Sequence, residues 1–401
     1  MRATSGKSAV TGIGIISCIG QNAEENWKSL LANKTGIGSL RLFSSRHQVP
    51  VGEIGLSNEQ LAEKAGLPAG KTYSRTALLG LIACQEALAD AGIDISEAKK
   101  AGKKIGIING TSIGGMDLSE NYFANQKAGK RARLRDLFEH DCGASTMRIA
   151  DHLGIKDFMT TISTACSSAA NAIMLGDRML RHHELDIVLV GGSDPLCKFT
   201  LNGFHSLGIL DTELCRPFDA TRTGLNLGEG AGFLVLQREE DSTQKTYCRL
   251  LGYANANDAF HQTATSEDGE GPYLAMKRAL DKAGLQPGDI DYINAHGTGT
   301  GNNDQSEATA FVRLFGEHSI PRFSSTKVYT GHTLGACGGI EAAYCALMIK
   351  NGTIVPTYNH TQTMEGLDAT PETQTTAATL KNVMSNSFGF GGNVSSLVFG
   401  E

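Results

Sequence analysis

One cysteine, Cys166, has a sequence setting that suits nucleophilic chemistry. It lies in Ser163-Thr-Ala-Cys-Ser-Ser-Ala169, between a β-rich segment and a run of small residues typical of a buried helix. Because aligned peptide dipoles at a helix N-terminus favour a thiolate, we expect the pKa of this thiol to fall. A thiolate attacks thioesters readily. Any of the nine cysteines could instead be a small buried hydrophobe, but only Cys166 combines a strand before it with a helix after it.

Two histidines and a lysine follow in the second half of the chain. His296 lies in Asn294-Ala-His-Gly-Thr-Gly-Thr300, at the end of an expected strand, so its side chain should face a crevice. His332 lies in Gly331-His-Thr-Leu-Gly-Ala336, shortly after Lys327, in a glycine-rich loop that leads into a helix. The loop lacks the GxxxxGK[ST] spacing of a phosphate-binding P-loop. A single histidine in such a place is more often structural, so the interpretation as an active site depends on Cys166, the two histidines and Lys327 occurring together.

A fourth segment, Ser387-Phe-Gly-Phe-Gly-Gly-Asn393, lies near the C-terminus. A tight loop of this composition could offer backbone N–H groups to an oxyanion, or it could be a plain turn between strands. One cysteine and two distant histidines fit thioester chemistry better than metal binding, because no CxxC or HxxxH pair is present. A papain-like hydrolase would need only one cysteine and one histidine.

Composition excludes several classes of protein. The 401 residues carry 36 basic and 42 acidic side chains, a net charge of −6, with no basic stripe, so a nucleic-acid partner is not expected. The nine scattered cysteines indicate reduced thiols in a cytoplasmic protein, and neither a disulfide framework nor a zinc site. The start of the chain lacks the apolar core of a signal peptide, and no apolar run approaches the roughly 20 residues that span a bilayer.

Strands and helices are expected to alternate along the chain. The apolar patterns predict strands at 9–16, 105–108, 158–163, 186–190, 291–295 and 395–399, and helices at 22–33, 75–91, 147–153, 273–283, 304–315 and 339–350. A further helix is expected directly after Cys166, and a β segment near residue 246. This alternation predicts an α/β fold with a largely parallel sheet.

The two halves of the chain resemble each other. Ala87-Leu-Ala-Asp-Ala-Gly-Ile93 is echoed by Ala279-Leu-Asp-Lys-Ala-Gly-Leu285, and each precedes a strand that contains Ile-Asn. Such helix ends also arise by coincidence, but the shared order favours a duplication. We therefore divide the chain into residues 1–245, which carry Cys166, and residues 246–401, which carry the two histidines and the lysine. A duplication would bring strand ends together in a crevice, where ligands bind.

Taken together, the motifs TACSSA, NAHGTGT, GHTLGA and SFGFGG, in this order, resemble the active site of β-ketoacyl-(acyl-carrier-protein) synthases of the elongating, Cys-His-His type. Val10-Thr-Gly-Ile-Gly14 is similar to the N-terminal strand motif of that family, and segments 216–224 and 227–236 are similar to its mid-chain signature. The resemblance covers nearly the whole chain. It implies a duplicated thiolase-like fold, five-layered αβαβα and usually dimeric.

The resemblance also implies roles for the reacting residues. Cys166 would accept the acyl group from the phosphopantetheine thiol of an acyl carrier protein. His296 and His332 would hold the malonyl thioester carbonyl and assist decarboxylation, and Lys327 would order and charge this network. Glu307 matches a structural carboxylate in the helix that follows the HGTGT motif. No metal or cofactor of the protein's own is implied, because the substrates are carried on phosphopantetheine.

Further positions match the binding features of the family. The backbone N–H groups of Cys166 and Phe390 match its oxyanion hole, and Phe390 also matches a gating phenylalanine. Thr298 and Thr300 match positions that bind the pantetheine arm, and Ile113 resembles a wall of the acyl pocket.

The implied activity is that of an acyltransferase. It would join malonyl and acyl groups by decarboxylative Claisen condensation, in fatty-acid or related polyene or polyketide biosynthesis. Its partners would be an acyl carrier protein and a second subunit, as a homodimer or as a heterodimer with a chain-length-factor-like protein. Two alternatives are a non-catalytic chain-length-factor-like subunit, which typically lacks the cysteine, and a thiolase, which uses a second cysteine where this chain has a histidine.

One departure from the family pattern stands out. The family usually has Thr-Asn after the last two glycines of the SFGFGG motif, whereas this chain has Asn393-Val394. The change concerns the conformation of the loop and the acyl preference, and it leaves the nucleophile in place. Together with the compact length of the chain, it favours a specialised polyene or polyketide pathway over housekeeping fatty-acid elongation. The acyl chain length and the type of primer are left open.

Overall fold

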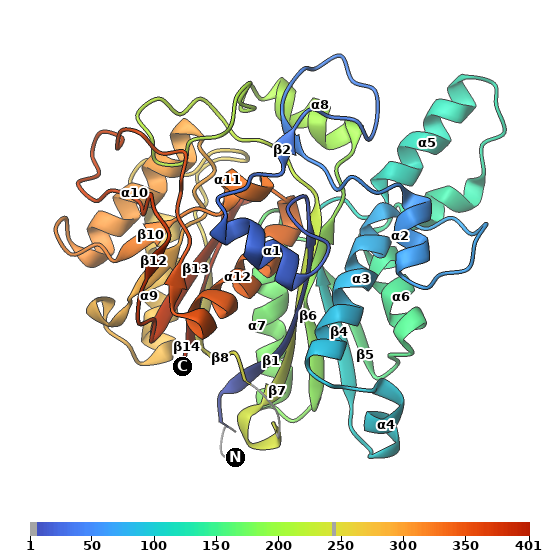
Figure 1. The fold of residues 1–401 in the computed structure, drawn as a ribbon, viewed down its shortest axis with the longest axis horizontal. Coiled ribbons are helices and arrows are strands. Elements are labelled where there is room, and N and C mark those ends of the chain that lie inside the picture. Colours follow the sequence, from blue (N-terminus) through green and yellow to red (C-terminus); the bar gives the residue numbers. More distant parts are fainter. Residues whose placement is uncertain (1–5, 243–245) are drawn as a thin grey trace.

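A ten-stranded mixed sheet forms the centre of the computed structural model, which describes residues 6–242 and 246–401 (Figure 1). The strand order is β10-β9-β13-β14-β8-β1-β7-β6-β4-β5. In chain order the strands are β1 (Ser8–Ser17), β4 (Ile105–Gly110), β5 (Phe158–Ile162), β6 (Ile187–Asp194), β7 (Gly230–Arg238), β8 (Cys248–Asn257), β9 (Tyr292–Asn294), β10 (Arg322–Ser324), β13 (Asn382–Gly389) and β14 (Asn393–Gly400). Two small two-stranded sheets pair β2 (Ile37–Gly38) with β3 (Val51–Gly52), and β11 (Thr353–Ile354) with β12 (Thr376–Ala377).

The sheet confirms the internal duplication. Starting from its centre, the first half runs β1-β7-β6-β4-β5 and the second half runs β8-β14-β13-β9-β10, so equivalent strands occupy equivalent places. Equivalent neighbours also pair in the same sense, and the two halves join where β1 and β8 pair antiparallel. The predicted division between residues 245 and 246 borders residues 243–245, which lie outside the described residues.

The prediction of a largely parallel sheet is wrong. Parallel pairs join β4 to β5 and β6, and β9 to β10 and β13, whereas the five pairs in the middle of the sheet are antiparallel. One reason is the tight turn between β13 and β14, since adjacent strands joined by a short turn must run in opposite directions. The other is β7, a strand that the sequence patterns did not predict and that pairs antiparallel with both of its neighbours.

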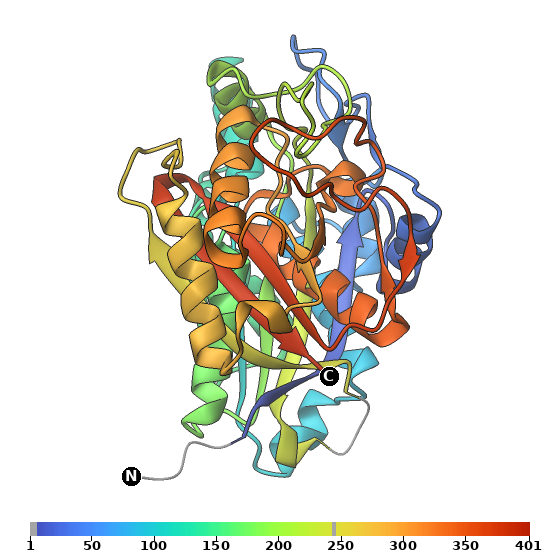
Figure 2. The same ribbon diagram turned by 90° about the vertical axis from the view of Figure 1, so that its left-hand side faces the viewer.

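Helices complete the five-layered αβαβα arrangement, whose layers follow one another from left to right in Figure 1; Figure 2 views the molecule from the side of α9 and α10. Helices α3 (Arg75–Asp90) and α6 (Cys142–Leu153) cover the outer face of the first half, and α9 (Glu270–Ala283) and α10 (Gly301–Phe315) cover that of the second. Helices α7 (Ser168–Arg181) and α12 (Cys337–Asn351) pack against each other between the two halves. The remaining helices are α1 (Ala23–Leu31), α2 (Asn58–Lys64), α4 (Ile95–Lys100), α5 (Met116–Lys127), α8 (Lys198–Ser206) and α11 (Lys327–Thr330).

The central position of α12 follows from its sequence. Every residue from Cys337 to Ile349 is buried, so the helix has no polar face to turn toward water. A helix that is apolar all round is stable only when it is surrounded by protein. Its one acidic residue in this stretch, Glu341, is therefore a conspicuous exception.

The predicted helices and strands are present, with shifted ends. The helix predicted at 147–153 begins at Cys142, and the strand predicted at 186–190 continues through two glycines to Asp194. Those glycines allow close packing, because a Cβ at Gly191 would lie 2.0 Å from the Gly232 carbonyl oxygen of the neighbouring strand. Within the described ranges, no helix is both long and apolar enough to cross a bilayer.

Candidate active site

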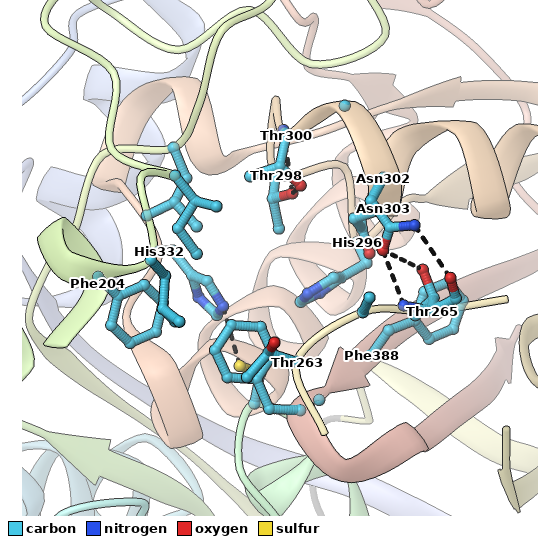
Figure 3. A pocket seen from close by; sticks show the side chains of 18 residues that line it. Phe204, Thr263, Thr265, His296, Thr298, Thr300, Asn302, Asn303, His332 and Phe388 are labelled. Carbon is cyan, nitrogen blue, oxygen red and sulfur yellow. Dashed lines mark hydrogen bonds between the residues drawn. The ribbon is translucent and has the colours of Figure 1, made fainter. Parts of the chain in front are cut away.

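Cys166 and the two histidines meet in one buried site between the two halves of the molecule (Figure 3). His332 Nε2 lies 3.0 Å from Cys166 Sγ, and the ring centroids of His332 and His296 are 5.3 Å apart. Cys166 follows β5, His332 follows β10 in the equivalent place of the second half, and His296 follows the neighbouring strand β9. The duplication therefore brings together three residues that are far apart in the sequence.

The hydrogen bonds around the two imidazoles determine their tautomers. The Leu334 N–H donates to His332 Nδ1 at 3.3 Å, and Lys327 Nζ lies 3.4 Å from His296 Nδ1. Burial and the charge of Lys327 hold the pKa of both histidines well below the usual value, so both rings are neutral. A neutral imidazole that accepts at Nδ1 carries its proton on Nε2. Both rings therefore offer an Nε2–H donor, and that of His332 faces the sulfur.

Lys327 forms a buried ion pair with Glu341, a residue that the sequence patterns did not single out. Lys327 Nζ and Glu341 Oε1 are 2.5 Å apart, and neither side chain is exposed by more than 4%. Burial opposes the charge of the lysine, but the carboxylate more than offsets this, so the pKa of Lys327 is raised and the ammonium persists. The signal that could have revealed Glu341 was a single acidic residue within an otherwise apolar helix.

We expect Lys327→Met to lower the free energy of unfolding by about 3–5 kcal/mol, because it leaves the Glu341 carboxylate buried without its cation. The measurement is the midpoint of urea unfolding. Lys28→Met is the matched control, since Lys28 pairs with Glu24 at 2.5 Å on the exposed surface and should have almost no effect. Equal shifts in the two variants would contradict a stabilising buried pair.

The expectation of a lowered pKa for Cys166 is wrong. Burial raises the pKa of its thiol to about 12, although the charge of Lys327 and the Phe390 N–H both act to lower it. The first residue of α7 is Ser168, two residues after Cys166, so the helix dipole does not offset the loss of water around a sulfur that is only 5% exposed. The resting group is therefore a neutral thiol.

This raised pKa predicts how the cysteine responds to pH. Below its pKa, the thiolate fraction of a thiol rises about tenfold per pH unit. We therefore expect the rate of Cys166 alkylation by iodoacetamide to rise throughout pH 7–10 without a plateau. A small free thiol, with a pKa of about 8.5, is the control and should level off within this range. A plateau for Cys166 near pH 7 would show that the pKa is lowered after all.

The Phe390 segment forms the turn between β13 and β14. Gly391 has φ +79°, a left-handed conformation that suits glycine. The backbone of this turn approaches the nucleophile closely, because a Cβ at Gly389 would lie 3.0 Å from Cys166 N. The Phe390 N–H faces the sulfur, and its ring stacks on Phe204 with centroids 5.5 Å apart. The segment is thus both a turn between strands and a candidate source of an oxyanion-hole N–H.

Two carboxylates hold the loop that carries His296. Glu307 accepts hydrogen bonds from the backbone N–H groups of His296 and Gly297, both at 2.9 Å. Asp304 accepts from Thr298 N at 3.0 Å, in the same loop. Burial raises the pKa of Glu307 to about 7, and the two N–H donors oppose this rise. These contacts fix the backbone from which His296 extends.

Cys166 lies at the junction of two cavities. The first, of about 280 Å³, contains both histidines; hydrophobic side chains form most of its wall, and its polar part is supplied by Thr263, Thr265, Thr298, Thr300, Asn302 and Asn303. The second, of about 390 Å³, has a largely apolar wall that includes Ile113, Phe199, Leu207 and Leu334. Phe204 and Phe390 line both cavities. The sulfur can therefore be reached from a cavity that carries hydroxyl and amide groups in part of its wall and from a cavity that is almost wholly apolar.

The described residues contain two groups whose atoms are close enough to share a metal ion. His296, Cys337 and Glu341 have ligand atoms within 4.8 Å of one another, but the Lys327 ammonium already bonds Glu341 and lies beside His296. A divalent cation there would meet a fixed positive charge. The other group, Glu317, His318 and Asp368, is fully exposed, as acidic surface clusters commonly are.

Comparison with known proteins gives a consistent result. The family model described as the N-terminal domain of β-ketoacyl synthase matches residues 7–242, and the model of the C-terminal domain matches residues 247–361. The 3-oxoacyl-[acyl-carrier-protein] synthase 2 of Staphylococcus aureus is 34% identical over 97% of this chain and 100% of that protein.

Two solved structures share the fold over almost the whole chain. The ishigamide ketosynthase/chain length factor has a TM-score of 0.91 and 30% identity, and covers 99% of each chain. A type II polyketide synthase acyl-carrier protein in complex with its ketosynthase, bound to the hexaketide, has a TM-score of 0.88 and 25% identity, again over 99% of each chain.

Proposed function

The chain belongs to the β-ketoacyl synthase family, and we propose that it is an elongating β-ketoacyl-(acyl-carrier-protein) synthase that carries its acyl group on Cys166. One observation carries the proposal. The Cys166 sulfur lies 3.0 Å from His332 Nε2, with His296 beside it, at the junction of two cavities, one lined partly by threonine and asparagine side chains and the other almost wholly apolar. This geometry suits a nucleophile that takes an acyl chain from one side and a second thioester from the other.

In the first step, the Cys166 sulfur attacks the thioester carbonyl of an acyl group delivered on an acyl carrier protein. The new C–S bond forms, the old C–S bond breaks, and the carrier thiol leaves with the proton that the cysteine gives up. The negative charge that develops on the carbonyl oxygen can be met by the N–H groups of Cys166 and Phe390. The acyl chain then occupies the apolar cavity.

In the second step, a malonyl thioester enters through the cavity that contains the histidines, and Thr298 and Thr300, which line it, would contact the pantetheine arm. The Nε2–H groups of His296 and His332 donate to its thioester carbonyl oxygen. As the C–C bond to the carboxylate breaks and CO₂ leaves, enolate charge develops on that oxygen, where the two donors stabilise it. The carbanion carbon then attacks the acyl-Cys166 carbonyl, a new C–C bond forms, and the acyl C–S bond breaks. Cys166 leaves as a thiolate, which takes a proton from water to become the thiol again.

The apolar cavity favours a reduced or polyene acyl chain. Its wall is formed mainly by hydrocarbon groups, with a few hydroxyls such as those of Ser112, Thr200 and Ser206. A poly-β-keto chain would place a carbonyl at every second carbon, and a buried carbonyl without a donor costs about 1–3 kcal/mol. The reaction therefore belongs to fatty-acid or related polyene biosynthesis.

The test is a panel of acyl carrier proteins loaded with saturated, polyene and poly-β-keto chains of equal length, each mixed with the protein and malonyl-carrier protein. We expect elongated saturated and polyene products, and extension of the poly-β-keto chain slowed about 5- to 150-fold for each carbonyl that is buried without a donor. The masses of the carrier-bound products report the outcome. If no chain is extended, the protein is a non-catalytic subunit of the chain-length-factor kind.

A second subunit is also part of the proposal. Strand β5 is an edge of the large sheet, and large apolar side chains are exposed on it and on α6, which packs against it: Met159 on β5 and Met147 on α6. The segment 134–139, which contacts α6, exposes Phe138, and α5, which contacts that segment, exposes Phe123. Exposed strand edges and apolar surfaces of this kind are usually covered by a partner. The partner would be a second copy of this chain or a chain-length-factor-like subunit, as in the similar ishigamide ketosynthase/chain length factor. Since all nine cysteines are free, we place the enzyme in the cytoplasm.

A further inference from the structure

The turn between β13 and β14 must be held from outside, because it contains little that holds it from within. Gly391 and Gly392 both have left-handed backbones, with φ of +79° and +74°. Glycine at these positions permits the turn but also leaves its peptide groups free to rotate. The N–H of Phe390, which the proposed reaction uses, lies immediately before these glycines. Its direction therefore depends on whatever fixes the following peptides.

The end of β8 and the loop that follows it, residues 257–262, bond the peptide groups of this turn. The Gly391 N–H donates to the Gln262 carbonyl at 2.8 Å, and the Asp258 N–H donates to the Gly392 carbonyl at 2.9 Å. Between them, Asn257 Nδ2 donates to the Gly391 carbonyl at 3.0 Å. The first two bonds join backbone to backbone, so the Asn257 bond is the one of the three that a substitution can remove.

The orientation of the Asn257 amide is fixed as well. Its Oδ1 accepts from the Ala259 N–H at 2.7 Å, and a backbone N–H can bond only to the oxygen, so Nδ2 is the group that faces the turn. Asn393, where the family usually has threonine, lies opposite Asn257 in the β8–β14 register. Its Nδ2 lies 3.5 Å from the Phe390 carbonyl. The departure in the loop sequence thus adds a second carboxamide, that of Asn393, to the one that Asn257 already places against the turn.

We propose that Asn257, supported by Asn393, is a positioning residue that fixes the Phe390 N–H where the oxyanion of the acyl-transfer step develops. The inference depends on the proposed function, because it concerns the same reaction. It goes beyond it by assigning a role to a residue that does not contact the substrate. Removing an oxyanion-hole donor typically lowers the rate ~10²–10³-fold, so misdirecting one should have a smaller effect, about tenfold.

The two half-reactions separate this role from a general structural one. The Phe390 N–H serves acyl transfer, whereas the two histidines serve decarboxylation. We therefore expect Asn257→Ala to slow acylation of Cys166 about tenfold. Malonyl decarboxylation is compared in two proteins that cannot be acylated, Cys166→Ala and the double variant Cys166→Ala/Asn257→Ala. The two should decarboxylate at the same rate. Acylation is followed by intact mass, and decarboxylation by conversion of malonyl-carrier protein to acetyl-carrier protein.

Two further variants sharpen the test. Asn257→Asp keeps the oxygen that Ala259 uses but lacks the donor, so it should slow acylation as much as Asn257→Ala does. Asn351→Ala is the matched control, since Asn351 is exposed at the end of α12 and donates to the Leu347 carbonyl of its own helix at 2.7 Å. It should acylate at the wild-type rate.

The proposal is overturned if both Asn257 variants acylate normally, if decarboxylation falls as much as acylation does, or if neither variant folds, because Asn257 would then be a structural residue. Failure of the wild-type protein to become acylated at Cys166 would instead contradict the proposed function. The two failures are therefore distinguishable in one experiment.

Discussion

Replacing Cys166 by alanine is expected to abolish formation of the elongated β-ketoacyl product while malonyl decarboxylation continues. The substitution removes the atom that carries the acyl chain, so condensation has no electrophile. The Nε2–H donors of His296 and His332 remain, because their tautomers are set by Lys327 and by the Leu334 N–H and not by the sulfur. The carbanion is then protonated, and the product is acetyl-carrier protein.

The two outcomes are measured together as the masses of the carrier-bound products. Cys142→Ala is the control, because Cys142 is a half-buried thiol at the start of α6, away from the two histidines, and its loss should leave condensation unchanged. Elongated product formed by Cys166→Ala would require another nucleophile. Loss of decarboxylation in that variant would mean that the thiol takes part in the step assigned to the histidines.

His332→Ala is expected to lower malonyl decarboxylation about 10²–10³-fold, the usual effect of removing one donor to a developing oxyanion. Self-acylation of Cys166 should survive at a reduced rate, since the Phe390 N–H and the charge of Lys327 still act on the sulfur. His332→Gln, which returns a neutral N–H donor to the same region, should recover part of the decarboxylation rate.

Decarboxylation is followed as release of CO₂ from malonyl-carrier protein, and acylation as the mass of the protein. Equal loss of both activities would contradict the division of roles between the histidines and the oxyanion hole. A His332→Gln variant no better than His332→Ala would indicate that the imidazole contributes more than a hydrogen-bond donor.

The duplication could be recognised in the sequence because helix ends have a local signature. The echo of Ala87–Ile93 in Ala279–Leu285 marks the ends of α3 and α9, which occupy equivalent outer layers. The direction of the strands could not be predicted in the same way. Strand β7 pairs with β1, which comes from the start of the chain, and with β6, from which residues 195–229 separate it. Local patterns carry no information on such pairing.

The site shows the same division between local and tertiary information. Cys166, His296 and His332 could be found from their motifs, and the structure brings them together. Glu341 could not be assigned, because its partner Lys327 comes from a different element. The raised pKa of Cys166 likewise follows from burial by the surrounding layers, which outweighs the local helix dipole on which the prediction depended.

The central claim is that one sulfur carries the growing chain. The most direct test is to incubate the wild-type protein with a carrier protein that is loaded with an acyl group. The wild-type protein is then digested, and the acyl group is located by peptide mass spectrometry. We predict one acylated peptide, the one that contains Cys166, and loss of the added mass when malonyl-carrier protein is supplied. An acyl group on any other residue, or a Cys166 adduct that malonyl-carrier protein does not discharge, would contradict the account.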